Sequence, residues 1–524
     1  MTASTAEPWV PASDGGAPPR LRAPLVALAG WWAVTRDDRA WWVGASVLAV
    51  GLAVALGTHP PAAPTLFWHL ANGDAIRGLV LPAHAPALVG GRHPFDARSW
   101  LADLALARLA PRVGPGGLTA LGAAGTVLLV GLVAAAARAA AAPARLHPVA
   151  MLAGVAAALA SMPTTLAGRE SLLLPVFTAA LVGLLAVARR TDRPRARRVT
   201  AARASVPVLL ALWANTQSDV VVGVGAVWLT VAAVRLAARG PARAQHRLPL
   251  WLPLAALLAP LANPTGPHLY AEVPLSLGGL GVHGVLTGWA SPDLQTWGRR
   301  WAELTALALA GAAALRPRRS HPADGALAVA ATVLALFFSH DLAVFAVVAG
   351  VWLAAQASSL GTGPAAAAIA RPARSRRLTA AALVPAVAGC VLAGSAAAAA
   401  AGAGGPGVQA ARGLPVATAN WLLRARPPGP WLTTVDVGSY LAARLPEGHR
   451  LLCLGDPVPL AGRGLRRCGQ LAAVAPDTPL LLRRLHLRLA VLPGDAGLTS
   501  LLRSRGWRVV ERGGAVVVLA PPAA

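Results

Sequence analysis

Polar and charged side chains recur in the short loops that separate the long apolar stretches of this chain. Imidazoles and carboxylates can accept a proton from a hydroxyl group, and guanidinium and amide groups can bind phosphate or hydroxyl oxygens. Such groups are costly beside a membrane, so a set of them on one face indicates a polar cavity there. The set comprises His69, Asn72, Asp74, Arg77, Arg169, Glu170, Asn215, Gln217, Asp219, Asn263, His268, Glu272, Asp293, His340 and Asp341.

For any one of these residues, a plainer role competes with chemistry. Asp219, Asp324 and Asp341 each precede an apolar stretch, where a carboxylate commonly caps a helix. Arg169 could pair with the adjacent Glu170 or with a lipid phosphate instead of a substrate. The hypothesis of a cavity therefore rests on the set as a whole.

The elements that position these side chains are about eleven apolar segments, several shorter than the roughly 20 residues of a full crossing. We expect helices over 41–57, 117–137, 148–162, 171–188, 205–214, 219–236, 248–262, 301–315, 324–338, 341–357 and 378–401. Outer loops over 58–116 and 263–300 connect some of them, the first containing a helix-like stretch at 99–110.

Arginines set the predicted orientation of these segments. The loop 189–203 carries seven arginines and stays on the cytoplasmic side by the positive-inside rule. Counting from this loop places the other basic loops inside as well, with the N-terminus in and the C-terminal region outside. The charge of +26 therefore reflects topology and anionic lipid heads, and nucleic-acid binding is not expected. The sequence predicts a multi-pass protein of the plasma membrane.

The two ends of the chain differ from the apolar middle. Residues 1–40 form a cytoplasmic segment, in which Trp31 and Trp32 would anchor an interfacial helix over 23–34. The membrane domain covers 41–401, and a Gly-rich linker follows at 402–413.

Short β-rich runs then alternate with helical runs, which predicts a small extracytoplasmic α/β domain over 414–524. Its sheet should be mainly parallel, with a terminal hairpin at Gly513 and Gly514. Cys453 and Cys468 could form a disulfide or remain as buried free thiols, whereas Cys390 lies in the last apolar segment.

An ordered series of motifs resembles a bacterial family of polytopic membrane proteins that is similar to the GT-C glycosyltransferases. FWHLANGDAIRG (67–78) resembles the family's first-loop W-W-H-L block, and SWLADLALARLA (99–110) resembles its W-L-x-E helix. Further similar blocks follow in the family's order, in the stretches 164–174, 212–224, 261–270, 288–294 and 435–446. The resemblance implies a GT-C-like membrane fold over most of the chain.

The resemblance also implies a reaction, the transfer of a sugar from a polyprenyl-phosphate donor to a glycan or protein acceptor of the cell envelope. Asp74 occupies the family's acidic position and would be the base, with His69 as the alternative base or a phosphate ligand. Arg169 would bind the donor phosphate, and Asn215 and Asn263 the acceptor hydroxyls. Asp293 offers a second carboxylate. The resemblance leaves cofactors undetermined and is compatible with a divalent metal.

The chain departs from the family at several positions. Thr65 replaces an acidic residue, the stretch 82–89 has no carboxylate, Gln217 stands in place of a histidine, and Gly288 in place of a glutamate. Two alternatives therefore stay open. One is a non-catalytic relative that binds lipid-linked glycans or partners of envelope assembly. The other is a transporter of lipid-linked sugars, although no internal repeat of the kind common in transporters is evident.

Overall fold

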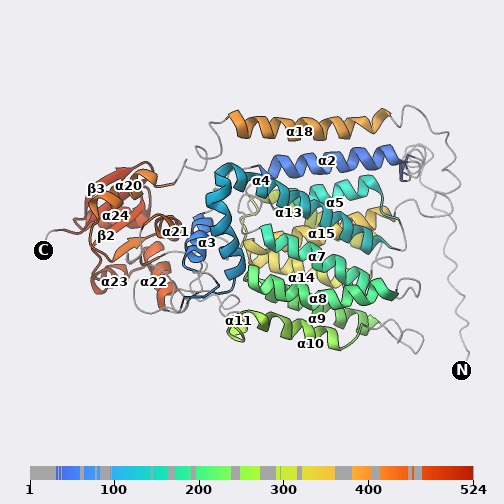
Figure 1. Cartoon of the computed structure of the whole chain (residues 1–524), viewed down its shortest axis with the longest axis horizontal. Coiled ribbons are helices and arrows are strands. Elements are labelled where there is room, and N and C mark those ends of the chain that lie inside the picture. Colours follow the sequence, from blue (N-terminus) through green and yellow to red (C-terminus); the bar gives the residue numbers. More distant parts are fainter. Residues whose placement is uncertain are drawn as a thin grey trace, which may run out of the picture.

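The computed structural model describes residues 31–32, 35–36, 38–58, 64–76, 79–82, 95, 97–142, 145–162, 172–190, 196–237, 248–271, 291–295, 297–315, 321–359, 380–402, 414–445, 451–453 and 463–522. Within these residues, a bundle of apolar helices is followed by a small domain with one sheet, which lies at one end of the bundle (Figure 1).

Each predicted apolar segment corresponds to a helix of the bundle. These helices are α2 (Arg39–Gly57), the second part of α4 (Trp100–Ala141), α5 (Pro148–Ala160), α7 (Leu173–Ala188), α8 (Ala196–Thr216), α9 (Val220–Ala237), α10 (Trp251–Leu258) with η4 (Ala259–Ala262), α13 (Trp297–Leu315), α14 (Pro322–Phe337), α15 (Leu342–Ser358) and α18 (Leu383–Gly402). The predicted span over 205–214 is only the end of α8, which begins in the basic loop.

Five stretches of the described chain are long and apolar enough to cross a membrane, and four shorter apolar helices accompany them. The most deeply packed of the five, Ser339–Ser358, is 78% buried, whereas Leu383–Ala400 is 6% buried. The first forms the centre of the bundle. The second, in α18, lies along α2 at the edge (Figure 1). This pattern of apolar helices is that of a multi-pass membrane protein.

Glycines allow the helices of the bundle to approach closely. A Cβ atom added to Gly51 of α2 would lie 2.2 Å from the carbonyl oxygen of Gly389 in α18. A Cβ atom on Gly154 of α5 would lie 2.4 Å from the carbonyl oxygen of Gly350 in α15. Small residues at such crossings are typical of helices that pack through van der Waals contact within lipid.

The long helix α4 consists of two parts that the sequence analysis treated separately. Gly114 has a φ of 63°, outside the helical region, and Pro111 and Pro115 flank it. Glycine tolerates this conformation and the prolines interrupt the backbone hydrogen bonds, so the helix bends there. The first part belongs to the outer loop, and the second is the apolar segment predicted over 117–137.

The predicted interfacial helix at 23–34 lies largely outside the described residues. Trp32, within the described part, stacks on His147, with ring centroids 3.8 Å apart and planes 9° from parallel. His147 is fully buried, and its Nε2 lies 2.8 Å from the carbonyl oxygen of Trp32. This N-terminal segment is therefore held by the end of α5.

The C-terminal domain contains a four-stranded sheet in the order β1-β2-β4-β3, formed by Trp431–Thr433, Leu489–Pro493, Val516–Ala520 and Arg508–Gly513. Its helices are α20 (Val416–Ala425), α21 (Val435–Arg444), α22 (Arg463–Ala472), α23 (Thr478–Arg484) and α24 (Gly497–Ser504). The terminal hairpin of β3 and β4 is confirmed, with Gly514 at positive φ in its turn.

The expectation of a mainly parallel sheet is wrong. Only β1 and β2 pair in parallel, apart from an isolated bridge between Trp431 and Leu451, whereas β4 pairs antiparallel with both β2 and β3. The reason is the hairpin, which returns the last strand directly beside β2. The β-rich run 431–437 forms a strand only over Trp431–Thr433, because Thr434 caps α21 by accepting from the backbone N–H of Val437.

The C-terminal domain shares its core with a helix of the first outer loop, α3 (Pro64–Asp74). Trp68 of α3 is 1% exposed and belongs to the hydrophobic cluster of the domain. Phe67 meets Tyr440 of α21 edge to face, with ring centroids 4.9 Å apart. In Figure 1, α3 lies between the bundle and the domain. The domain therefore holds the helix that carries His69.

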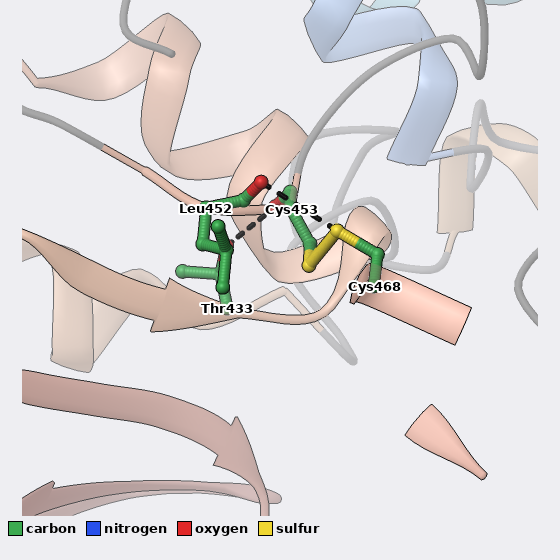
Figure 2. The surroundings of a disulfide bond; sticks show 4 residues. All are labelled: Thr433, Leu452, Cys453 and Cys468. Atoms are coloured by element: carbon green, nitrogen blue, oxygen red, sulfur yellow. Dashed lines mark hydrogen bonds between the residues drawn. A yellow bond between two sulfur atoms is a disulfide. The ribbon is translucent and has the colours of Figure 1, made fainter. Parts of the chain in front are cut away.

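A disulfide joins Cys453 to Cys468, which settles the alternative left open by the sequence (Figure 2). It links the segment beside β1 to α22, and both cysteines are at least 97% buried. Next to it, the Thr433 hydroxyl donates to the carbonyl oxygen of Cys453 at 2.5 Å. A disulfide favours an oxidising compartment, which agrees with the predicted extracytoplasmic location.

We expect the double replacement Cys453→Ser and Cys468→Ser to lower the free energy of unfolding of this domain by about 3 kcal/mol, the loop-closure effect of a short loop. The loss of stability is measured by thermal unfolding of the purified proteins and by their resistance to limited proteolysis. Cys390→Ser is the matched control, because Cys390 is exposed on α18 and unpaired in the structure. Equal resistance of all three proteins to protease would contradict the prediction.

The predicted orientation can be tested with reporter fusions. A reporter fused after residue 200 should be active only in the cytoplasm, because the arginines at 189–203 hold that loop inside. A reporter fused after residue 410 should be active only outside. The opposite result at either site would refute the argument from the arginines.

Candidate functional site

Two helices of the first outer loop, α3 and the beginning of α4, bring the central polar pair together. Gly73 of α3 packs against the backbone of α4, where an added Cβ would lie 2.1 Å from the carbonyl oxygen of Asp103. Only a residue without a side chain fits at this separation. The two backbones are therefore close enough for side chains one turn earlier on α3 to meet the Asp103 carboxylate.

His69 and Asp103 form the pair. Nδ1 of His69 lies 2.6 Å from Oδ1 of Asp103; the carboxylate is fully buried, whereas 14% of the histidine side chain is exposed. A carboxylate can only accept, so Nδ1 carries the hydrogen and Nε2 is the basic nitrogen of the neutral ring. This arrangement orients an imidazole to accept a proton.

Two further side chains bind the same carboxylate. Asn72 Nδ2 donates to Oδ2 of Asp103 at 2.5 Å, and the Ser99 hydroxyl donates to the same oxygen at 3.1 Å. A buried carboxylate is costly unless hydrogen bonds compensate for the lost water. Asn72 and Ser99 supply that compensation and fix the orientation of the group that holds His69.

A second polar cluster lies where the α8–α9 turn meets the beginning of α15. Oδ2 of Asp219 is 2.9 Å from Nε2 of His340 and accepts from Nε2 of Gln217 at 2.9 Å. Arg98, 4% exposed and next to Ser99, is close enough for its charge to act on Asp219. Arg98 and Ser99 thus connect the two clusters along the chain.

The asparagines predicted to bind an acceptor also hold the loops together. Trp100 Nε1 donates to Oδ1 of Asn215 at 2.7 Å. Asn263 is 2% exposed; its Nδ2 donates to the carbonyl oxygens of Ala97 and Ala214, at 3.1 and 2.6 Å. Its Oδ1 accepts from the backbone N–H of Thr265 at 2.7 Å. These amides bind protein groups in the structure, and a role with an acceptor stays a prediction.

Of the remaining predicted site residues, Asp74 lies on α3 but not with His69. It is exposed, and the His69 side chain pairs with Asp103 instead. Five residues along a helix correspond to about 140° around its axis, so the two side chains leave α3 in different directions. Although the residue as a whole is exposed, partial removal of its carboxyl from water raises the pKa of Asp74, and the positive charge of Arg108 opposes that rise.

Asp293 is exposed, and its carboxylate accepts from the backbone N–H of Gln295 at 3.0 Å. Arg169 and Glu170 lie outside the described residues, as do Arg77 and Glu272. The turn 213–219 and Asn263 contact the first loop through the hydrogen bonds above, and His340 contacts the same turn through Asp219.

Sequence reasoning did not identify two pairing partners: Asp103, which pairs with His69, and His340, which pairs with Asp219. Asp103 occupies the acidic position of the W-L-x-E-like helix, which was a usable signal. His340 was in the polar set, yet nothing local indicated that it would meet Asp219, 121 residues away.

The residues that could hold a divalent metal fall short of a ligand set. In the part of the chain that the structure describes, no group of three His, Cys, Asp or Glu side chains converges. His69 and Asp103 offer two groups, and they bind one another.

Comparison with known proteins extends this picture. No profile of a known protein family matches the chain, and no curated protein matches its sequence. Among solved structures, the archaeal oligosaccharyltransferase AglB from Archaeoglobus fulgidus, in complex with an inhibitory peptide and a dolichol-phosphate, superposes with a TM-score of 0.51 at 11% identity, over 86% of this chain and 69% of that one.

ArnT from Cupriavidus metallidurans, bound to undecaprenyl phosphate, gives a TM-score of 0.48 at 15% identity over 93% of this chain and 99% of that one. The likeness to AglB concerns the fold, because the identity is too low to carry residue roles. With its helical bundle, outer-loop helices and small terminal domain, the chain has a GT-C-like fold.

Proposed function

We propose that this protein is a membrane glycosyltransferase that transfers a sugar from a polyprenyl-phosphate donor to an acceptor of the cell envelope at the outer membrane face. The observation that carries the proposal is the His69–Asp103 pair, a buried carboxylate orienting a partly exposed imidazole at the end of a GT-C-like bundle. AglB was solved in complex with a dolichol-phosphate, which agrees with a lipid-linked donor.

In this reaction, the acceptor hydroxyl attacks the anomeric carbon of the donor sugar. A new carbon–oxygen bond forms there, and the bond from that carbon to the phosphate oxygen breaks. The polyprenyl phosphate leaves with the electron pair of the broken bond. Nε2 of His69 takes the proton of the hydroxyl, and Asp103 stabilises the imidazolium that results. A guanidinium beside the leaving phosphate lowers the barrier further.

Asp74, the base favoured by the sequence, is the alternative acceptor of this proton. Its raised pKa makes the carboxylate a better base than an ordinary aspartate. We retain Arg169 as the phosphate ligand, because guanidinium binds phosphate through two hydrogen bonds. Asn215 and Asn263 would contribute to the acceptor side from the loops they hold, and Asp293 remains a second carboxylate of the outer loops.

The test is a transfer assay with the full chain in nanodiscs. The donor is a polyprenyl-phosphate sugar, and a set of envelope glycans serves as acceptors. We expect turnover by the wild type, and for Arg169→Ala a roughly tenfold or greater loss of donor affinity, because the phosphate loses its bidentate partner. Arg145→Ala is a control, because that arginine lies at the other end of the bundle, before α5.

Two results would contradict the proposal. Donor binding without turnover for every acceptor and donor tried would favour a non-catalytic relative, to which the missing carboxylates at Thr65 and 82–89 also point. Movement of the intact lipid-linked sugar across a vesicle membrane, without transfer, would favour a transporter.

A further inference from the structure

We propose that the C-terminal domain has a second binding site, for an anionic saccharide that carries a carboxylate or a phosphate. A cavity of about 400 Å³ lies between α22 and α23, lined by Arg467, Gln470, Asp477, Leu480, Leu481, Arg484 and Leu485. This inference goes beyond the transfer reaction, because binding at this site is measurable whether or not the protein turns over.

The two helices present one face each to the cavity. Arg467 and Gln470 are one turn apart on α22, and Leu480, Leu481 and Arg484 follow the i, i+1, i+4 spacing of one face of α23. The adjoining side of α22 carries Cys468 and Leu471, which are 2% and 1% exposed. The disulfide (Figure 2) and these buried side chains hold α22 against the domain core, and Arg467 extends from this helix.

The charge of the cavity favours an anion. Gln470 Nε2 donates to Oδ2 of Asp477 at 2.9 Å, so the one carboxylate of the lining is held by an amide. Within the described part of the chain, neither Arg467 nor Arg484 forms an ion pair. Residues 463–522 contain ten arginines and only three acidic residues, Asp477, Asp495 and Glu511. Two guanidinium groups therefore remain to bind a carboxylate or phosphate.

The rest of the lining fits a sugar better than a bare phosphate ion. Leu480 is 51% exposed at the cavity, and Leu481 and Leu485 extend this apolar wall. A pyranose ring has an apolar face of C–H groups that can cover such a wall, and its hydroxyls can bind Asp477 and Gln470. Binding sites of this kind combine apolar walls with a few oriented polar groups.

The experiment uses the full chain in nanodiscs of zwitterionic lipid. The probe is a fluorescent hexasaccharide of alternating glucuronic acid and N-acetylglucosamine, and maltohexaose is the neutral comparison. We expect binding of the acidic probe only, weakened about tenfold or more by Arg467→Gln or Arg484→Gln. Arg483→Gln is the matched control, an exposed neighbour on α23 outside the cavity lining, and should change binding less than about twofold.

Several outcomes would overturn the proposal. These are equal binding of maltohexaose, an equal loss with Arg483→Gln, or full displacement of the probe by anionic lipid in the nanodisc, which would identify lipid headgroups as the ligand. Unchanged thermal unfolding of the Gln variants excludes a folding defect. If one of them unfolds, Arg467→Lys and Arg484→Lys, which keep the charge, should retain more binding than the Gln variants. His69→Ala should bind the probe as the wild type does, which separates this site from transfer.

Discussion

His69→Ala should lower kcat for sugar transfer by about 10²- to 10⁴-fold while leaving donor binding within about threefold. The alanine variant lacks the nitrogen that accepts the hydroxyl proton, but it retains Arg169, the proposed ligand of the donor phosphate. The measurement is turnover in the nanodisc assay beside a separate donor-binding titration. A parallel loss of kcat and donor affinity would mean that His69 binds phosphate and does not act as the base.

The partner carboxylate acts through His69 and is therefore a positioning residue. Asp103→Asn should lower kcat by about 10²-fold and leave donor affinity unchanged. The neutral amide neither orients the imidazole of His69 as the carboxylate does nor stabilises the imidazolium. Asp103→Glu keeps the carboxylate, as in the W-L-x-E helix that this segment resembles, and should retain more turnover than Asn. If Glu and Asn lost activity equally, the role of Asp103 would be structural only.

Asp74→Asn distinguishes the two candidate bases. If His69 accepts the proton, this variant should keep turnover within about threefold of the wild type, because Asp74 is exposed and leaves α3 away from the pair. Abolished turnover in Asp74→Asn, with activity retained in His69→Ala, would reverse the assignment in favour of the base predicted from sequence.

The second large effect is expected from a single methyl group. Gly73→Ala should lower transfer by about 10²-fold, because a Cβ there would lie 2.1 Å from the carbonyl oxygen of Asp103 and must push α3 away from α4. This variant removes no polar group, so a loss of kcat reports the separation of His69 from Asp103. We also expect a lower thermal unfolding temperature, since overpacking costs about 1–3 kcal/mol.

Gly131→Ala is the matched control for this variant. Gly131 lies in the second part of α4, where an added Cβ would meet nothing within 4 Å. It should leave turnover unchanged and can raise helix stability slightly, because alanine is the better helix former. Wild-type activity in Gly73→Ala would show that α3 and α4 can separate without consequence, and the proposed pair would lose its support.

Much of the membrane domain was predictable because hydropathy and length are local properties. An apolar stretch in lipid must satisfy its backbone hydrogen bonds within itself, so a helix follows wherever the stretch is long enough. The segments at 41–57, 148–162 and 341–357 therefore agree with α2, α5 and α15 within a few residues. The boundary of α8 was misjudged, because its basic beginning is helical without being apolar.

The C-terminal sheet shows where local patterns are insufficient. Runs of valine and leucine identified β2, β3 and β4, and the two glycines identified the hairpin. The alternation of strands with helices suggested a mainly parallel sheet. Pairing partners depend on contacts between distant segments, and the place of β4 beside β2 was decided by the fold of the whole domain.

The candidate site, too, was predictable from the sequence only in part. The sequence by itself determined the apolar segments and identified the polar residues between them, His69 included, because hydropathy, charge and motif are carried by neighbouring residues. Tertiary structure decided that Asp103, 34 residues away, and not Asp74, is the partner of His69. The physical reason is the packing of α3 on α4 at Gly73: a close approach of two backbones selects which side chains meet, and no local pattern records it.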